Sequence, residues 1–253
     1  MMTDNDDSIA TGAGATPWRP WGFWATAGLG AGVLVAFLLL ELAAIVPFVI
    51  SAMIAGDAGS EAIAALATNA EYLAAALFVS GFGCTALILL LVRLRQGATV
   101  REYLALRAPR WQELLIWIVL ALVVVAAMDA ISMLLGRDVV NDWWVDVWAN
   151  AKAPLVLVFA TVVAAPLFEE TFFRGFLFRG LAHSKLGVVG AILVTAVVWA
   201  AIHLQYGAYE ITQIFVLGIL LGIARHRTGS LVVPLAIHAA VNLGANIQVA
   251  YLT

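Results

Sequence analysis

The chain has 253 residues, of which 64% are hydrophobic and 11% are charged, and its formal net charge is -3. An ordinary soluble domain carries about 25% charged residues, so this composition excludes a typical water-soluble protein and indicates a surface that faces lipid. The slightly negative charge gives no basis for nucleic-acid binding. Cys84 is the single cysteine and lies in an apolar run, which excludes an internal disulfide and argues against a cysteine protease or a redox enzyme.

The first 20 residues are polar, acidic and rich in small side chains, and they lack the basic n-region of a cleaved signal peptide. They are predicted to form a disordered cytoplasmic tail. Residues 21–253 carry the apolar segments. They are predicted to form a single transmembrane domain, because no other stretch is long enough to make a separate soluble domain.

A membrane-spanning helix needs about 20 mostly apolar residues. The first candidate segment is longer than one straight span, and Glu41 and Pro47 are expected to tilt or kink it. The predicted fold class is therefore an all-α, polytopic transmembrane bundle with seven or eight spans. The seven candidate segments are 22–54, 72–93, 112–135, 153–173, 187–205, 208–224 and 230–251.

Basic residues predict the orientation, because cytoplasmic loops of membrane proteins carry an excess of Lys and Arg. When the seven segments cross the bilayer alternately, all but two of the 13 basic residues fall on the side of the N-terminus. The two exceptions are Arg137 and Lys152. The N-terminus is therefore predicted to lie in the cytoplasm.

Two connecting stretches have a composition typical of the membrane surface. Residues 96–113 are amphipathic and are predicted to form an interfacial helix on the cytoplasmic face. The linker 136–152 carries three tryptophans and three aspartates on the opposite side. Because tryptophan prefers the headgroup level, this linker is predicted to be an aromatic anchor. The alternative is that it gates the access of substrate.

Ionisable side chains inside a membrane helix are costly, so each one is a candidate functional residue. Glu169 and Glu170 are adjacent and would point about 100° apart on a helix, so they are not expected to share a role. Glu170 and Arg174 have the i, i+4 spacing of a helical ion pair. Glu169 would then be free to face a cavity as a general base. The alternative is that both carboxylates are structural and pair with Arg174 and Arg179.

The last segments carry further polar residues at helical spacing. Trp199 and His203 would share one helix face, although a lone histidine near the end of a span is more often structural than functional. Ser230 can cap the final helix. His238 and Asn242 would also project from one face of it, and an apolar helix has no structural need for that asparagine.

These side chains could act together in hydrolysis. Glu169 and His203 could hold and deprotonate a water molecule, while His238 and Asn242 could donate hydrogen bonds to an oxyanion. Alternatively, Glu169, His203 and His238 could ligate zinc, which would lower the pKa of a bound water. The residues leave open whether zinc or no cofactor is used. The HExxH motif of many zinc proteases is absent.

Three short patterns occur in order: Glu-Glu-x-x-x-Arg at 169–174, Trp-x-x-x-His at 199–203 and His-x-x-x-Asn at 238–242. Together they resemble the EExxxR, FxxxH and HxxxN/D motifs of the CAAX protease and bacteriocin-processing (CPBP, or Abi) family, which includes the type II CAAX prenyl endopeptidases. The resemblance covers a core at about residues 150–245. It departs from the family pattern at Trp199, where phenylalanine is usual.

The resemblance implies an intramembrane endopeptidase, of a glutamate or a metal-dependent type, in the plasma membrane of a bacterium. Its partners would be membrane lipid and a membrane-associated or prenylated-like peptide or protein substrate. The same division of roles between a water-activating pair and an oxyanion pair is implied, with Glu170 and Arg174 as supporting residues. The identity of the substrate stays open.

Two other classes of protein compete with the protease. A proton-coupled transporter could use Glu41, Asp129, Glu169 and His203 as a relay, although the sequence shows no internal repeat. A non-catalytic immunity or scaffold protein could have the same fold without catalytic activity. A shared hydrolytic site predicts that the Glu169 carboxylate lies within about 7 Å of both His203 and His238, so that a bridging water can link them.

Overall fold

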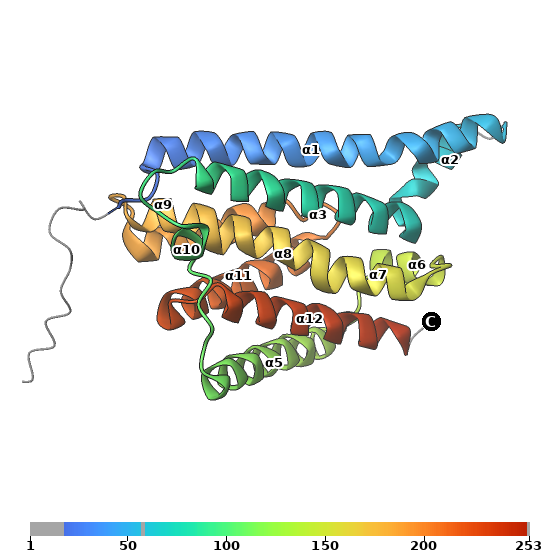
Figure 1. Ribbon diagram of the computed structural model, residues 1–253. Coiled ribbons are helices and arrows are strands. Elements are labelled where there is room, and N and C mark those ends of the chain that lie inside the picture. Colours follow the sequence, from blue (N-terminus) through green and yellow to red (C-terminus); the bar gives the residue numbers. More distant parts are fainter. Residues whose placement is uncertain (1–17, 57–58, 252–253) are drawn as a thin grey trace, which may run out of the picture.

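The computed structural model describes residues 18–56 and 59–251, and within these ranges the chain is a bundle of helices without strands (Figure 1). The predicted all-α polytopic bundle is confirmed. Six helices of the described ranges are long and apolar enough to cross a membrane, and α10 is a shorter apolar helix. The six are α1 (Phe23–Ile54), α3 (Ala70–Arg93), α5 (Trp111–Leu134), the continuous helix Pro154–Ala182, α11 (Ala208–Thr228) and α12 (Val232–Ala250); α10 spans Gly187–Ala201.

Most of the predicted tail, residues 1–17, lies outside the described residues. Residues 18–20 belong to the folded part of the protein. The ring of Trp18 stacks on Tyr103 with 5.8 Å between centroids, and the Arg95 side chain donates a hydrogen bond to the carbonyl of Arg19 over 2.8 Å. The folded domain therefore begins slightly before the predicted boundary at residue 21.

Helix α1 runs along one edge of the bundle as a single continuous helix, with Pro47 inside it (Figure 1). It packs mainly on α3. Its other face is apolar and exposed, as at Leu42. Near its start, α1 approaches the end of the buried helix closely: a Cβ atom added at Gly180 would lie 1.9 Å from the Thr26 hydroxyl. A small residue at this crossing lets the two helix backbones approach.

The helix Pro154–Ala182 is the core of the bundle. It consists of α7 (Pro154–Phe159), a π-helical stretch (Ala160–Ala164), α8 (Ala165–Glu170), a second π-helical stretch (Thr171–Leu177) and α9 (Phe178–Ala182). It extends beyond the predicted end at residue 173. The reason is burial: the aromatic residues at 172, 173 and 176 pack inside the bundle, so this part of the helix is covered by protein.

The predicted interfacial helix over 96–113 was wrong in extent. The segment forms the short helix α4 (Val100–Leu104), which starts with a capping box between Thr99 and Glu102 and ends at Ala105 in the left-handed conformation. Glu102 Oε2 accepts hydrogen bonds from the Thr99 hydroxyl over 2.7 Å and from the Thr99 amide over 2.9 Å, and both lower the pKa of the Glu102 carboxyl. Tyr103 is fully buried, which raises its pKa to about 12.

Two contacts attach this segment to the bundle. The Arg107 guanidinium donates to the carbonyl of Thr228 over 2.7 Å, and the Ser230 hydroxyl donates to the carbonyl of Arg107. The chain is thereby fixed to the turn between α11 and α12. The same Ser230 oxygen accepts a hydrogen bond from the amide of Val232 over 3.1 Å. The predicted cap at Ser230 was wrong by one residue, because α12 begins at Val232 with Leu231 at the N-cap position and without a side-chain cap hydrogen bond.

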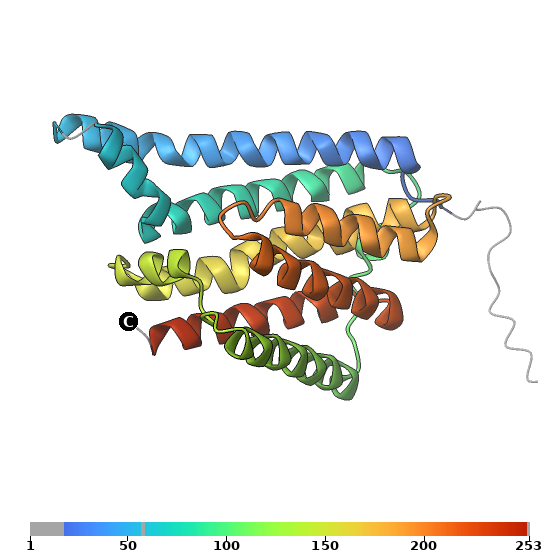
Figure 2. The ribbon, with the colours of Figure 1, turned by 180° about the vertical axis from the view of Figure 1, so that it is seen from behind.

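The remaining elements position the candidate site. Helix α2 (Ser60–Ala65) and a 3-10 turn (Leu66–Thr68) connect α1 to α3, and α6 (Asp142–Ala149) connects α5 to the buried helix. Seen from behind, α10 and α11 lie side by side across the bundle, with α12 and then α5 beyond them (Figure 2). The buried helix and the facing sides of α10, α11 and α12 surround the polar residues identified in the sequence.

Candidate functional site

Glu169 and Glu170 lie at the end of α8, between the two π-helical stretches of the fully described helix 154–182. A π-turn widens the helix and is often found at functional sites. The two carboxylates have different surroundings, as predicted: Glu170 is fully buried, whereas Glu169 is 14% exposed and lines a cavity.

The predicted pair between Glu170 and Arg174 is present. An Arg174 Nη1 hydrogen bond reaches Glu170 Oε1 over 2.9 Å, and both side chains are fully buried. Arg174 Nη2 also donates to the carbonyl of Gly218 over 3.0 Å, and the guanidinium lies 4.6 Å from the ring centre of Trp199. Arg174 therefore ties the buried helix to α10 and α11.

His238 lies between the two glutamates. Its Nδ1 is 2.9 Å from Glu170 Oε1, and its Nε2 is 4.0 Å from Glu169 Oε2. Because Glu170 is paired with Arg174 and acts as an acceptor, we assign the proton to Nδ1. The separation of 4.0 Å is too long for a direct hydrogen bond but fits a bridging water. The part of the distance prediction that concerned His238 is thus confirmed.

His203 was expected on the helix, but α10 ends at Ala201 and His203 lies in the following turn. Its Nδ1 is 2.7 Å from the carbonyl of Trp199. A carbonyl only accepts, so Nδ1 carries the proton and Nε2 is an acceptor when the ring is neutral. The side chain thus satisfies one of the free carbonyls at the helix end, which is the physical reason that the helix stops here.

A row of aromatic rings connects His203 to its surroundings. The His203 ring is 5.3 Å from Trp199 and 6.2 Å from Tyr206, and Trp199 is 5.2 Å from His238. Burial raises the pKa of Tyr206, in the turn before α11, to about 12, so it stays protonated at neutral pH. His203, Glu169 and His238 all line the same cavity.

Trp199 has a role that its motif position did not suggest. Its indole Nε1 donates a hydrogen bond to Glu169 Oε2, which phenylalanine could not do. The replacement of the usual phenylalanine therefore adds a polar contact to the carboxylate, beyond packing. The sequence indicated this role only by placing Trp199 where the family usually has phenylalanine.

Asn242 and Asn246 bind the first π-helical stretch. The Asn242 amide donates to the carbonyl of Thr161 over 2.8 Å, and the Asn246 amide donates to the Thr161 hydroxyl over 3.1 Å. Asn246 is buried and was missed in the sequence, although its spacing of eight residues from His238 puts it on the same face of α12. Each asparagine amide has two N–H donors, so Asn242 retains one for a ligand in the cavity.

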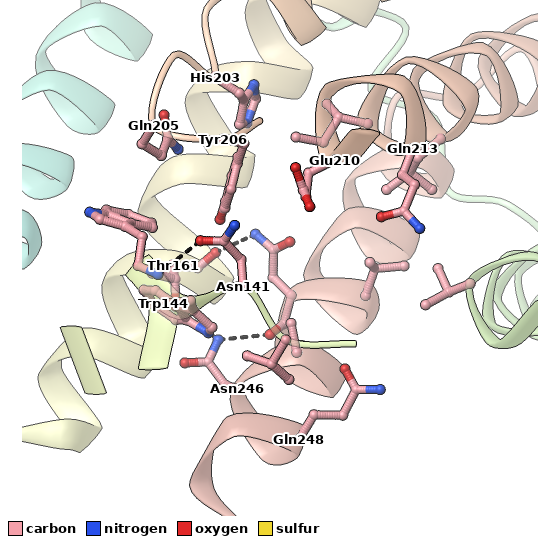
Figure 3. A pocket seen from close by; sticks show the side chains of 18 of the residues that line it. Asn141, Trp144, Thr161, His203, Gln205, Tyr206, Glu210, Gln213, Asn246 and Gln248 are labelled. Carbon is pink, nitrogen blue, oxygen red and sulfur yellow. Dashed lines mark hydrogen bonds between the residues drawn. The ribbon is translucent and has the colours of Figure 1, made fainter. Parts of the chain in front are cut away.

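The cavity has a volume of about 320 Å³ and is lined by α3, α5, α8, α11, α12 and two connecting segments. Asn141 and Trp144 line it from the α5–α6 linker and α6, and Gln205 and Tyr206 line it from the turn after α10 (Figure 3). The tryptophans of the linker were predicted to be membrane anchors. Trp143 and Trp144 line the cavity, which favours the alternative in which the linker controls access.

The four residues of the alternative proton relay do not all line the cavity. Asp129 lines the cavity with Glu169 and His203, and its carboxylate accepts a hydrogen bond from Gln248 over 2.9 Å. Among the described residues, Glu41 is absent from the lining. It lies on α1 in the part of the bundle that packs on α3. A continuous relay through these four residues is not favoured.

The zinc alternative does not fit the geometry. Within residues 18–56 and 59–251, no group of three or more His, Cys, Asp or Glu side chains is arranged to hold a metal ion. Glu169 Oε2 instead accepts a hydrogen bond from Trp199. Glu169, His203 and His238 are therefore better described as hydrogen-bonding groups.

Comparison with known proteins agrees with the motifs. Residues 151–244 match the family model described as type II CAAX prenyl endopeptidase Rce1-like. Over this segment, which is less than half of the chain, the protein is similar to the Rce1-like CAAX proteases. The match contains all three sequence patterns and both π-helical stretches, so it coincides with the part of the chain that carries the candidate site.

One curated relative is an uncharacterized 24.3 kDa protein of Escherichia coli. It is 31% identical over 96 residues, which make up 36% of this chain and 44% of that protein. The similarity thus spans less than half of the length of either protein. No solved structure shows a significant match to the chain.

Proposed function

We propose that this chain is an intramembrane endopeptidase that hydrolyses a peptide bond of a membrane-associated substrate with a water activated by Glu169 and His203. One observation carries the proposal: His238 contacts the buried Glu170 through Nδ1 and faces the cavity-lining Glu169 through Nε2. The match of residues 151–244 to the CAAX proteases supports the same reaction class.

The first step is the activation of water. A water in the cavity can donate hydrogen bonds to Glu169 and to His203 Nε2, which is left as an acceptor by the bond from Nδ1 to the carbonyl of Trp199. Glu169 takes one proton as the water oxygen attacks the carbonyl carbon of the peptide. The Trp199 indole holds the carboxylate in place during this transfer.

The attack places a negative charge on the carbonyl oxygen. The second N–H of Asn242 can donate to this oxyanion, and His238 can donate from Nε2 when its ring is protonated on both nitrogens. The ring lies between the carboxylates of Glu169 and Glu170, which fix its orientation toward the cavity. Glu170 and Arg174 act as positioning residues because they fix the His238 ring.

The second step is the collapse of the tetrahedral intermediate. The carbon–nitrogen bond breaks, and the proton held by Glu169 passes to the leaving amine. The water has then supplied the hydroxyl of the new carboxyl group and the proton of the new amine. No metal ion takes part, and the glutamate returns to its ionised form.

The test is cleavage of a fluorescence-quenched peptide library by the purified protein in lipid vesicles. Glu169→Gln, which keeps the shape of the side chain, should lower the rate by about 10²–10⁴-fold, the usual contribution of a general base. His203→Ala and His238→Ala should also lose most activity. Wild-type activity should persist with a chelator present. Undiminished cleavage by Glu169→Gln would refute the mechanism.

A matched control is Glu113→Gln, which changes a half-buried carboxylate in the first turn of α5 and lies outside the cavity lining. This variant should cleave at the wild-type rate. A similar loss in both variants would mean that the assay reports general damage to the protein and not the loss of a base.

A further inference from the structure

The lining of the cavity comes predominantly from one end of the bundle. Asp138 and Asn141 belong to the linker after α5, Gln205 and Tyr206 to the turn after α10, and Gln248 to the last turn of α12. Figures 1 and 2 place α6 and the C-terminal end of α12 together at this end, opposite the start of α1. The cavity therefore opens toward the end formed by residues 136–153 and 202–207.

The opposite end of the bundle carries most of the positive charge. The α3–α5 connection, the α9–α10 turn and the last turn of α11 all lie there, and they hold nine of the chain's Lys and Arg residues. These residues are Arg93, Arg95, Arg101, Arg107, Arg110, Arg179, Lys185, Arg225 and Arg227. The end with the cavity opening has Arg137 and Lys152 as its basic residues within the described part of the chain.

The rim of the opening is tied to the candidate catalytic residues. The Trp143 indole donates to the carbonyl of Ala67 over 2.9 Å, which holds α6 against the end of the bundle. The Trp143 ring is 5.6 Å from Tyr206, whose ring stacks on His203. A chain that enters between α6 and the turn 202–207 would have to separate Trp143 from Tyr206, and it would then meet His203.

We infer that the cavity opens on the extracytoplasmic side of the membrane, and that its substrates are polypeptide segments presented on that side, admitted between α6 and the turn 202–207. Basic loops stay on the cytoplasmic side during membrane insertion, and this places the opening on the other side. That the admitted segments are substrates rests on the proposed function. The side of the membrane on which the cavity opens does not depend on that function.

The experiment is thiol labelling with a membrane-impermeant maleimide in a bacterial host. The wild type is the blank, because its one cysteine, Cys84, is fully buried. Asp138→Cys and Asp146→Cys put exposed thiols at the cavity end, and Gln96→Cys and Lys185→Cys put them at the basic end. Two positions at each end guard against a variant that fails to fold.

The cavity-end cysteines should be labelled in intact spheroplasts, and the basic-end cysteines only in inverted vesicles. The reverse pattern, or labelling of both ends from the same side, would overturn the inference. A bulky maleimide on Asp138→Cys should also abolish peptide cleavage, whereas the same label on Gln96→Cys should not. If the wild type cleaves no peptide, the proposed function fails, and the labelling pattern still decides on which side the cavity opens.

Discussion

The helix Pro154–Ala182 and helix α5 are both long and apolar, yet the first is mostly buried in the bundle and the second is mostly exposed. In the most apolar stretch of the helix Pro154–Ala182, 56% of the residues are buried inside the bundle. In the most apolar stretch of α5, 6% of the residues are buried. The buried helix carries Glu169, the Glu170–Arg174 ion pair and two π-helical stretches. Contacts from Arg174 to the carbonyl of Gly218 and from Glu170 to His238 join it to neighbouring helices. Helix α5 presents mostly aliphatic side chains to lipid.

This difference shows where selection on side-chain identity is expected to act in a membrane protein. Lipid is as apolar as a leucine side chain, so a lipid-facing helix gains little from any particular aliphatic residue. A helix surrounded by protein must satisfy each polar group and fill each space, because both unpaired charge and cavities are costly. The two helices should therefore respond very differently to substitution.

The largest effect is expected from Arg174→Leu. The substitution leaves Glu170 as a buried carboxylate without its cation, and breaking a buried pair in this way costs about 3–5 kcal/mol. The measurement is the free energy of unfolding in detergent. Arg93→Leu, at the exposed end of α3, is the control and should change stability by less than about 0.5 kcal/mol. Equal effects would contradict the comparison.

A packing substitution should separate the two helices directly. Phe172→Ala removes a fully buried ring and should destabilise the protein by about 3–5 kcal/mol. Ile116→Ala on α5 removes a side chain that is 65% exposed to the lipid, and its effect should be within about 0.5 kcal/mol. Unfolding in the same detergent measures both. A loss for Ile116→Ala as large as that for Phe172→Ala would show that α5 packs against a partner.

A smaller effect is expected from Trp199→Phe, which keeps an aromatic ring but removes the hydrogen bond to Glu169. A single hydrogen bond contributes about 0.5–1.5 kcal/mol, so kcat should fall by about 2- to 10-fold with KM little changed. A purely structural role for the indole would leave kcat unaltered. Phenylalanine is usual at this motif position in the CAAX proteases, so the variant is expected to fold.

The smallest effect concerns the attachment of α5. Ser132 shares hydrogen bonds with Tyr209 over 2.9 Å and with Gln213 over 3.1 Å, and these join α5 to α11 beside the cavity. Ser132→Ala should destabilise the protein by about 0.6 kcal/mol, the average for polar contacts between membrane helices. Hydrogen exchange of the α5 amides should increase more than that of the buried helix. Equal changes in both would argue against a separately held α5.

Much of the fold could be predicted from the chain because hydropathy and length define spanning helices. The pairing of Glu170 with Arg174 and the different surroundings of the two glutamates followed from spacing. The last helix begins at Val232, two residues after the predicted start of that segment. The predictions failed where packing overrides local pattern. The segment 96–113 looked like one amphipathic helix, but only Val100–Leu104 is helical, because Tyr103 is buried and Arg107 is bound to the α11–α12 turn.

The candidate site shows the same limit. Spacing identified Glu169, His203, His238 and Asn242 as partners, but it placed His203 on a helix that ends two residues earlier. It also missed Asn246 and the polar role of Trp199, because both depend on atoms of a different helix. A hydrogen bond between α10 and α8 cannot be read from the periodicity of either one.

The sequence by itself determined that the protein lies in a membrane, which helices cross it and which polar residues are unusual there, because these properties depend on local composition and helical periodicity. Tertiary structure decided which nitrogen of each histidine faces the cavity, which helix meets lipid and at which end the cavity opens. Those features depend on contacts between helices far apart in the chain. The large difference between the buried helix and α5 is therefore a property of packing and not of hydropathy, since both helices are apolar enough to cross the membrane.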